Sequence, residues 1–163
     1  MLSESLIRTT LQDNHLVGNI VREESNKDYE GFSISIDRIP FRSRLAKITP
    51  KKKGYFVALW IKDSQGVNQA YTVDQTSDKT IISVIDYTLH KKGQFVFPKD
   101  ELIKRGITKT KDQKGKMGFR VYPDWVTDLN ATAKKTQVWQ CNYFIDLSGD
   151  HSIKELEDLY FQK

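Results

Sequence analysis

The sequence predicts an α/β (α+β) protein with a mixed central sheet flanked by helices. Two segments, YFVALWI at residues 55–61 and IISVI at residues 81–85, are apolar on both faces, as strands in the middle of a sheet are. Residues 32–36 alternate between apolar and polar side chains, which is typical of a half-buried strand. Helix-capping patterns lie between and around these strands. Interspersed helices and strands of this kind indicate one mixed architecture.

The first third of the chain is expected to form one helix and two strands. Ser3 or Ser5 would cap a short N-terminal helix, because their hydroxyl oxygens accept hydrogen bonds from free backbone N–H groups. The strand at residues 32–36 is followed by a second one, expected at residues 41–48 and ended by Pro50. A basic turn then leads into the first strand that is apolar on both faces.

The rest of the chain is expected to contain three helices and two short strands. The strands are predicted at residues 94–97 and 117–121, and the second directs Arg120 away from its apolar neighbours. A basic loop lies between them. The helices are predicted at residues 98–105 after Pro98 as a first helical residue, at residues 131–143 after Asn130, and after the capping box formed by Ser152 and Glu155.

Composition excludes several classes of protein. The chain has 163 residues and a formal net charge of +5. It has no apolar run of the ~20 residues that cross a bilayer, and its N-terminus turns polar too early for a signal peptide. Cys141 is the single cysteine, and the three histidines lie at no metal-ligand spacing. We therefore expect a cytoplasmic protein without a membrane partner or a metal site.

Positive charge is concentrated in two segments. Residues 38–53 contain seven basic side chains and no acid, and residues 104–120 contain seven more, opposed only by Asp112. A field focused in this way is what a surface that binds a polyanion requires. The sequence contains no phosphate-binding loop, dinucleotide-binding, serine-hydrolase or zinc-protease motif.

Five segments resemble the MepB family, in the order in which that family has them. They are YEGF at residues 29–32, RLAKITPKKKGYFVALW at 44–60, FVFPKDELIKRGI at 95–107, KMGFRVYPDW at 116–125 and AKKTQVWQCNYF at 133–144. The resemblance implies one MepB-like domain over residues 1–163, with a fold like that of restriction endonucleases. It also implies a bacterial protein linked to multidrug efflux, because the family takes its name from an efflux operon.

Nucleases of that fold hold Mg²⁺ with an acid on one strand and a Glu-x-Lys or Asp-x-Lys triplet on the next. Here the matching triplet is Leu45-Ala46-Lys47, so the lysine is present and the acid is absent. Glu30 or Asp37 upstream could supply one carboxylate, which makes a poor magnesium site alone. Three further acids remain alternatives if the fold brings them close: Asp74, Asp78 and Asp86.

Whether the chain is an enzyme therefore stays open. We expect no required cofactor. If the protein is a catalyst, it would be a phosphodiesterase or nuclease with a degenerate site, using Mg²⁺ or Mn²⁺ with Glu30 and Lys47 as the catalytic residues.

The candidate phosphate ligands lie mainly in the first basic segment. Arg44 and Lys47 are expected to face phosphate, since arginine can grip two oxygens through its planar fork. The alternative is a solvated edge strand protected by its charges. Lys52 lies in the following turn and is either a further phosphate ligand or a solvated lysine. Arg120, within an apolar strand, needs either a bound anion or an ion pair to Asp78 or Glu30.

Residues 134–140 suggest a place for the base. Lys135, Gln137 and Gln140 supply hydrogen-bonding groups around Trp139, a combination that can stack a base and read its edge. The alternative is that the tryptophan packs into the core. Trp60 is expected in the core, and Trp125 is expected either to pack or to line a pocket. Cys141 lacks a basic partner and is not expected to be a nucleophile.

Three functions are compatible with these residues. The first is binding of single-stranded nucleic acid or of a small nucleotide such as a cyclic dinucleotide, with weak phosphodiesterase activity as an option. The second is a metal-dependent nuclease. The third is a regulatory protein-interaction module whose basic face meets an acidic partner. The sequence does not fix the oligomeric state.

Overall fold

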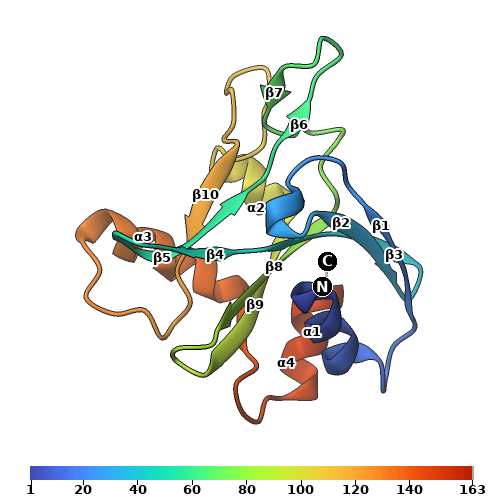
Figure 1. The fold of residues 1–163 in the computed structure, drawn as a ribbon, viewed down its shortest axis with the longest axis vertical. Helices are drawn as coiled ribbons and strands as arrows, with labels where there is room; N and C mark the ends of the chain where they lie inside the picture. The colour runs from blue at the N-terminus through green and yellow to red at the C-terminus, as the bar shows by residue number, and fades with distance from the viewer. Residues whose placement is uncertain (163) are drawn as a thin grey trace.

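A six-stranded mixed sheet forms the centre of the computed structural model, which describes residues 1–162 (Figure 1). Its strands, in spatial order, are β1 (Val17–Arg22), β2 (Phe32–Ile36), β3 (Ile39–Leu45), β8 (Lys79–Asp86), β9 (Lys91–Pro98) and β11 (Phe144–Asp146). β3 and β8 run parallel, whereas the other neighbours are antiparallel. The mixed sheet with flanking helices confirms the predicted fold class.

A second, three-stranded antiparallel sheet packs against the first. Its order is β10 (Gly118–Val121), β5 (Lys52–Ala58) and β4 (Lys47–Thr49). The chain continues from β5 into a small hairpin, β6 (Ile61–Lys62) and β7 (Asn68–Gln69), which projects from the body of the molecule at the top of Figure 1.

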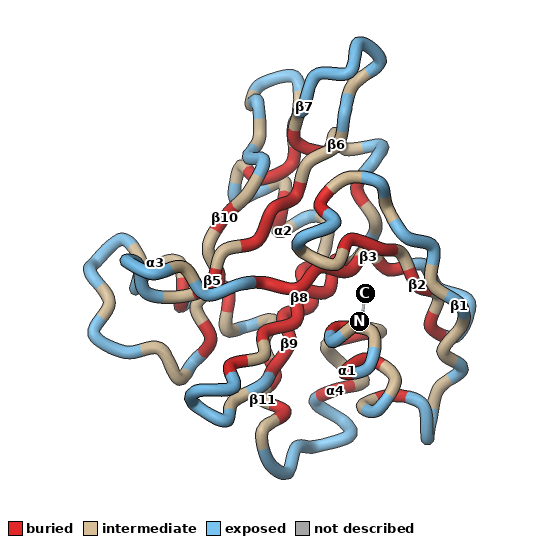
Figure 2. The backbone as a smooth tube through the Cα atoms, in the orientation of Figure 1, coloured by how far each residue is buried: buried red, intermediate tan, exposed pale blue. Residues whose placement is uncertain are grey.

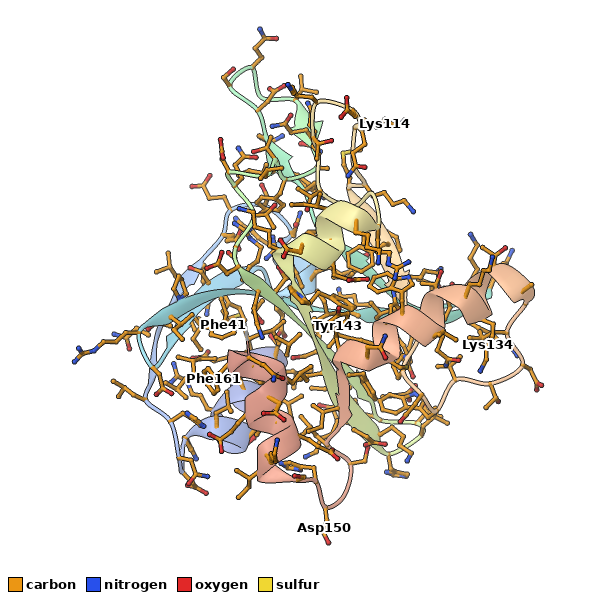
Figure 3. The ribbon with its side chains drawn as sticks, turned by 180° about the vertical axis from the view of Figure 1, so that it is seen from behind. Phe41, Lys114, Lys134, Tyr143, Asp150 and Phe161 are labelled. Atoms are coloured by element: carbon orange, nitrogen blue, oxygen red, sulfur yellow. The ribbon has the colours of Figure 1, made fainter. Side chains whose placement is uncertain are left out.

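Helices cover both faces of the central sheet. α1 (Leu2–Leu11) and α4 (Ile153–Phe161) lie together against one face, while α2 (Lys99–Lys104) and α3 (Ala131–Gln140) accompany the three-stranded sheet on the other (Figures 1 and 3). Short 3-10 helices lie at η1 (Lys27–Tyr29) and η2 (Cys141–Tyr143). No helix among residues 1–162 is long and apolar enough to span a membrane.

Two hydrophobic cores result, one on each side of the central sheet. The first joins α1 and α4 to the sheet and is fixed by aromatic contacts such as Phe41 with Phe161, whose rings lie 6.4 Å apart (Figure 3). The second joins the two sheets, so that Tyr55 and Val57 of β5 pack with Ile82 and Phe97 of the central sheet. Figure 2 shows both cores as the buried segments of the central strands.

Many of the predicted elements are present. The strand at Phe32–Ile36 has its predicted bounds, and it turns into β3 through a two-residue hairpin in which Asp37 and Arg38 both have positive φ. Asn130 caps α3 by accepting a hydrogen bond from the backbone of Ala133. Ser152 caps α4 through the backbone N–H of Glu155.

The strand predicted at residues 41–48 is wrong as one element. The chain leaves the central sheet after Leu45 and enters the three-stranded sheet at Lys47. Ala46, which is buried, makes the change and still bonds to the central sheet through its N–H to the carbonyl of Ser83. Arg44 and Lys47 therefore belong to different sheets. β1, β6, β7 and β11 were not predicted at all.

The predicted serine cap of the first helix is also wrong. α1 begins at Leu2, and neither Ser3 nor Ser5 accepts a capping bond. The carboxylate of Glu30 caps the helix instead, because it accepts hydrogen bonds from the backbone N–H groups of Leu2 and Ser3 at 3.2 and 2.8 Å. A negative charge at this end of the helix is also favourable, because the helix dipole is positive there.

Candidate nucleic-acid interface

The three-stranded sheet has one face turned to the core and one turned away from it. Tyr55 and Val57 of β5 face the core with Phe119 and Val121 of β10. Because side chains alternate along a strand, Phe56 and Arg120 point to the opposite side. We call this side, with the loop residues that lie on it, the outer face.

One row of side chains crosses the outer face from edge to edge. Phe56 in the middle strand pairs with Lys47 of β4 on one side and with Arg120 of β10 on the other. Lys47 is exposed, whereas Phe56 and Arg120 are half-buried. Directly paired residues on one face lie ~4.5–5.5 Å apart at Cβ, so an aromatic ring lies between two cations.

Two glycines leave room for aromatic rings on this face. A Cβ at Gly118 would lie 2.4 Å from Cζ of Phe56, so this ring covers the glycine. Gly54 has φ +78°, and a Cβ there would lie 2.6 Å from Cδ1 of Tyr122. The rings of Phe56 and Tyr122 therefore occupy space that larger residues would fill.

Tyr29 adds a third ring from outside the sheet. It lies at the end of η1, and its ring centroid is 6.1 Å from that of Phe56 in an edge-to-face arrangement. Nζ of Lys47 lies 5.2 Å from the Tyr29 ring centroid, within the range of a cation–π contact. Tyr29, Phe56 and Lys47 thus form one aromatic and cationic cluster, with Tyr29 half-buried.

Arg120 lies across the sheet rather than pairing with an acid. Its Nη1 donates to the carbonyl of Lys53 at 3.1 Å, and its Nη2 donates to the hydroxyl of Thr49 in β4. Neither Asp78 nor Glu30 is its partner, so the alternative of an ion pair to one of these acids is wrong. Both of these acceptors are neutral oxygens, and the guanidinium lies on a half-exposed face.

Trp60 extends the outer face beyond the end of β5. Leu59 belongs to the core between the sheets, and by alternation Trp60 lies on the side of Phe56. Trp60 is half-buried, which corrects its expected place in the core, and Nζ of Lys62 lies 5.8 Å from its ring centroid. The face therefore continues with a second aromatic residue and a second lysine.

Arg44 is buried rather than exposed to phosphate. Its side chain is 0% exposed. Nη1 donates to Glu23 at 3.1 Å, Nη2 to the hydroxyl of Tyr71 at 2.9 Å, and Nε to Oδ1 of Asn26 at 3.1 Å. The prediction that Arg44 faces phosphate is wrong, because its donors serve the protein's own interior. The sequence alone does not show that Glu23, twenty-one positions earlier, lies against this arginine.

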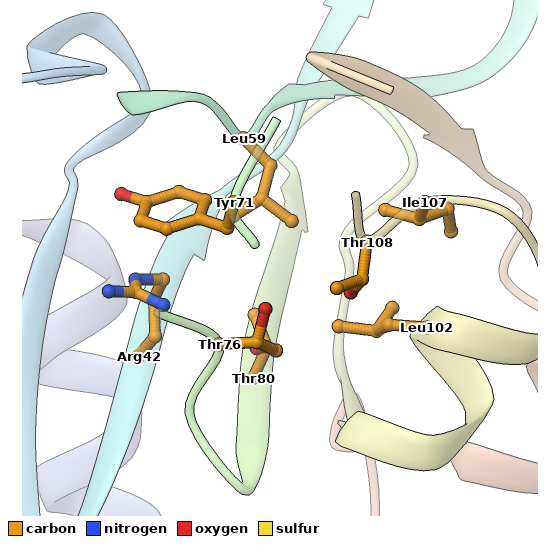
Figure 4. A pocket seen from close by; sticks show the side chains of 8 residues that line it. All are labelled: Arg42, Leu59, Tyr71, Thr76, Thr80, Leu102, Ile107 and Thr108. Carbon is orange, nitrogen blue, oxygen red and sulfur yellow. The ribbon is translucent and has the colours of Figure 1, made fainter. Parts of the chain in front are cut away.

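Arg42 completes this buried cluster. Its guanidinium lies 3.9 Å from the Tyr71 ring centroid, and its Nε donates to Glu23 at 3.1 Å. Figure 4 shows Arg42 and Tyr71 at a small cavity that threonine and aliphatic side chains also line. Burial opposes ionisation of Glu23, but hydrogen bonding to Arg44 and the charges of both arginines outweigh it and hold the pKa of Glu23 below its usual value.

The glutamines of α3 serve the backbone instead of a base. Gln140 is 0% exposed; its Oε1 accepts from the N–H of Tyr122 and its Nε2 donates to the carbonyl of Arg120, at 2.9 and 2.8 Å. Gln137 is buried and donates to the carbonyls of Pro123 and Val126, each at 2.9 Å. The expectation that both glutamines contact a ligand is therefore wrong. They fix the segment that carries Arg120 and Tyr122.

Of three remaining predicted residues, two are exposed to solvent and one packs against the core. Lys52, at the start of β5, and Lys135, on α3, are both exposed, and their role in phosphate binding stays a prediction. Trp139 is half-buried and packs against Phe97, with ring centroids 5.5 Å apart, so the core alternative holds for it.

The proposed catalytic pair does not form a metal site. Glu30 already accepts hydrogen bonds from Leu2 and Ser3, including one from the Ser3 hydroxyl. Leu45 is buried in the central sheet, while Lys47 lies in the other sheet. Residues 1–162 contain no group of three or more His, Cys, Asp or Glu side chains that could hold a metal ion. Glu30 and Lys47 therefore do not provide, at their positions, the site for Mg²⁺ or Mn²⁺ that a nuclease would need.

The aromatic residues of the outer face form no recognisable motif in the sequence. Tyr29, Phe56 and Tyr122 all lie in segments with family resemblance, but each is also an ordinary residue of a strand or turn. The available signal was the pair Gly54 and Gly118, since a glycine within a strand marks a close approach by another group. Only the register of the sheet brings these positions together.

Fold and surface together define a mixed α/β protein whose smaller sheet presents an aromatic and basic face. The model of the MepB-like family matches residues 23–146. A solved structure described as the crystal structure of MepB is similar, with a TM-score of 0.81 and 41% identity over 90% of this chain and 97% of that chain. The chain belongs to the MepB-like family, as its five segments predicted.

A second solved structure is much less similar. A bacterial homing endonuclease gives a TM-score of 0.43 and 13% identity, over 86% of each chain. A similarity this weak carries no information about function. No protein with curated annotation matches the chain.

Proposed function

We propose that the outer face binds single-stranded nucleic acid, or a small nucleotide that presents the same base and phosphate chemistry. The observation that carries this is the row in which Phe56 lies between Lys47 and Arg120, with the Tyr29 ring beside it. Unstacked bases bind to aromatic side chains in any sequence, while neighbouring cations neutralise the phosphates. A duplex keeps its bases stacked and unavailable to these rings.

Each side chain has a definite role in this proposal. Phe56 and Tyr29 stack with bases. Lys47 and Arg120 neutralise phosphate, and Arg120 is the better fixed of the two because Lys53 and Thr49 hold its guanidinium. Lys52 is a further phosphate ligand at the start of the middle strand of the same sheet. Lys135 lies on α3 and would meet a longer strand.

Fluorescence anisotropy with a labelled decathymidylate tests the proposal. Lys47→Gln is the test variant, because it removes an exposed charge beside Tyr29. Lys154→Gln is the matched control, because it removes the same charge from α4, whose Lys154 side chain is 84% exposed. One phosphate contact to a single strand contributes roughly fivefold in affinity at about 0.1 M salt, so Lys47→Gln should bind roughly fivefold more weakly and Lys154→Gln normally.

The same assay separates the competing functions. Tighter binding of a duplex of equal length, or equal losses in both variants, would contradict the outer face as a single-strand site. A cyclic dinucleotide that competes at lower concentration than the decathymidylate would identify the small ligand as the physiological class. No binding of any nucleotide, together with stoichiometric recovery of one acidic protein, would favour the protein-interaction alternative.

A further inference from the structure

The turn that carries Tyr29 is built on a single asparagine. Asn26 has φ 63°, and its carbonyl accepts the N–H groups of Tyr29 and Gly31 at 3.0 and 3.2 Å. Its side-chain Oδ1 accepts the backbone N–H of Trp60 at 3.1 Å. One residue thus ties the η1 turn to the end of β5, where the second aromatic part of the outer face begins.

Arg44 lies directly beneath this turn. Its Nε donates to the same Oδ1 of Asn26 at 3.1 Å. A Cβ at Gly31 would lie 3.3 Å from Cζ of Arg44, so the glycine rests on the guanidinium. Glu23 and Tyr71 hold the other side of the guanidinium, which leaves this buried group little freedom to move.

We propose that Arg44 and Asn26 are positioning residues that hold Tyr29 and Trp60 in place for base stacking without touching the ligand. The inference rests on the proposed function and deepens it. Stacking needs a ring at a fixed height and tilt, and Tyr29 lies in a turn rather than in the sheet. The buried arginine supplies through Asn26 the rigidity that sheet hydrogen bonds give to Phe56.

Salt dependence distinguishes a positioning residue from a phosphate ligand. Removal of a phosphate ligand reduces the slope of log K against log salt by about 0.7 for a single strand. Removal of a positioning residue weakens binding at every salt concentration and leaves the slope unchanged. The probe is again the labelled decathymidylate, titrated with native protein and variants across a range of salt.

Asn26→Gly is the main variant, because glycine tolerates the positive φ while the shared acceptor is lost. Asn26→Asp is the control, since it keeps a side-chain oxygen for Trp60 and Arg44. We expect Asn26→Gly to bind roughly tenfold more weakly with the native slope, as for the loss of one stacked base. Asn26→Asp should bind within about twofold of the native protein.

A double-mutant cycle with Tyr29→Ala supplies the second readout. If Asn26 acts through the two rings, Asn26→Gly should cost clearly less once Tyr29 is alanine, and only the share that acts through Trp60 should remain. Arg44→Lys gives an independent reading if Asn26→Gly does not fold, because lysine keeps the charge beside Glu23 but lacks the planar fork that also reaches Asn26. Its loss in affinity should likewise shrink in the Tyr29→Ala background.

The possible failures are separable. If native protein does not bind the decathymidylate, or if Lys47→Gln binds normally, the proposed function fails. If native binding and the effect of Lys47→Gln are as expected but Asn26→Gly binds normally, reduces the slope, or adds fully to Tyr29→Ala, the positioning role is refuted and the function stands.

Discussion

Phe56→Ala should weaken binding of a single strand without changing its dependence on salt. The ring lies over Gly118 and beside Tyr29, between two cations that do not depend on it for their charge. Stacking of one base contributes about 1–3 kcal/mol. Since a tenfold change in affinity corresponds to ~1.4 kcal/mol, the expected loss is roughly 5- to 150-fold.

The stability of the protein should fall much less than for a core phenylalanine. Phe56 is half-buried on the outer face, whereas Phe95 and Phe97 are fully buried, and truncation of such buried rings costs about 3–5 kcal/mol. Phe56→Ala should lose about half of this or less.

Anisotropy with the labelled decathymidylate, combined with thermal unfolding, measures both quantities. Phe56→Tyr is the control, because it retains the ring and should bind nearly as the native protein does. The reasoning is refuted if the folded alanine variant binds at native affinity, or if its salt slope falls by about 0.7, the value for one lost phosphate contact.

Three further predictions follow from buried groups. Glu23→Gln should be destabilised by about 3–5 kcal/mol at neutral pH, because it leaves buried Arg44 without its anion. The lowered pKa of Glu23 means that its carboxylate stabilises the native protein at pH values above the usual carboxylate range. In urea unfolding, the difference in stability between native protein and variant should therefore narrow as the pH falls below about 4. Burial raises the pKa of the half-buried Cys141 to about 11, so its thiolate fraction at about pH 8 should be roughly 100-fold below that of an ordinary cysteine. Because nucleophilicity rises with pKa, its reaction with a disulfide reagent should be roughly 10-fold slower, and reaction at the ordinary rate would contradict the raised pKa. Gln140→Leu should lower the free energy of unfolding, measured in urea, by ~2–4 kcal/mol, because it leaves the N–H of Tyr122 and the carbonyl of Arg120 without hydrogen-bond partners. A variant as stable as the native protein would show that β10 does not need the hydrogen bonds from Gln140.

Local patterns predicted the central elements of the fold well. Alternation identified β2, the apolar run identified β8, and the caps at Asn130 and Ser152 identified α3 and α4. These features depend on residues close together in the sequence. The passage of the chain from one sheet to the other at Ala46 has no such signal, because strands on both sides of it continue the same apolar and basic pattern.

The candidate site was less predictable for the same reason. Whether a basic residue faces solvent or an interior acid depends on partners distant in the sequence, as Glu23 is from Arg44. The amides of Gln137 and Gln140 satisfy backbone groups of a loop that the sequence places elsewhere. Lys47 and Arg120 lie 73 positions apart in the sequence, and only their common partner Phe56 brings them into one row.

Photochemical crosslinking locates the binding surface most directly. A single strand that contains 5-iodouridine can be irradiated with the protein and the adducts identified by mass spectrometry after digestion. Binding at the outer face predicts adducts at its aromatic residues, which are Tyr29, Phe56, Trp60 and Tyr122. Adducts confined to aromatic residues elsewhere, such as the exposed Tyr87 in the β8–β9 turn or Phe161 in α4, would contradict the assignment of this face.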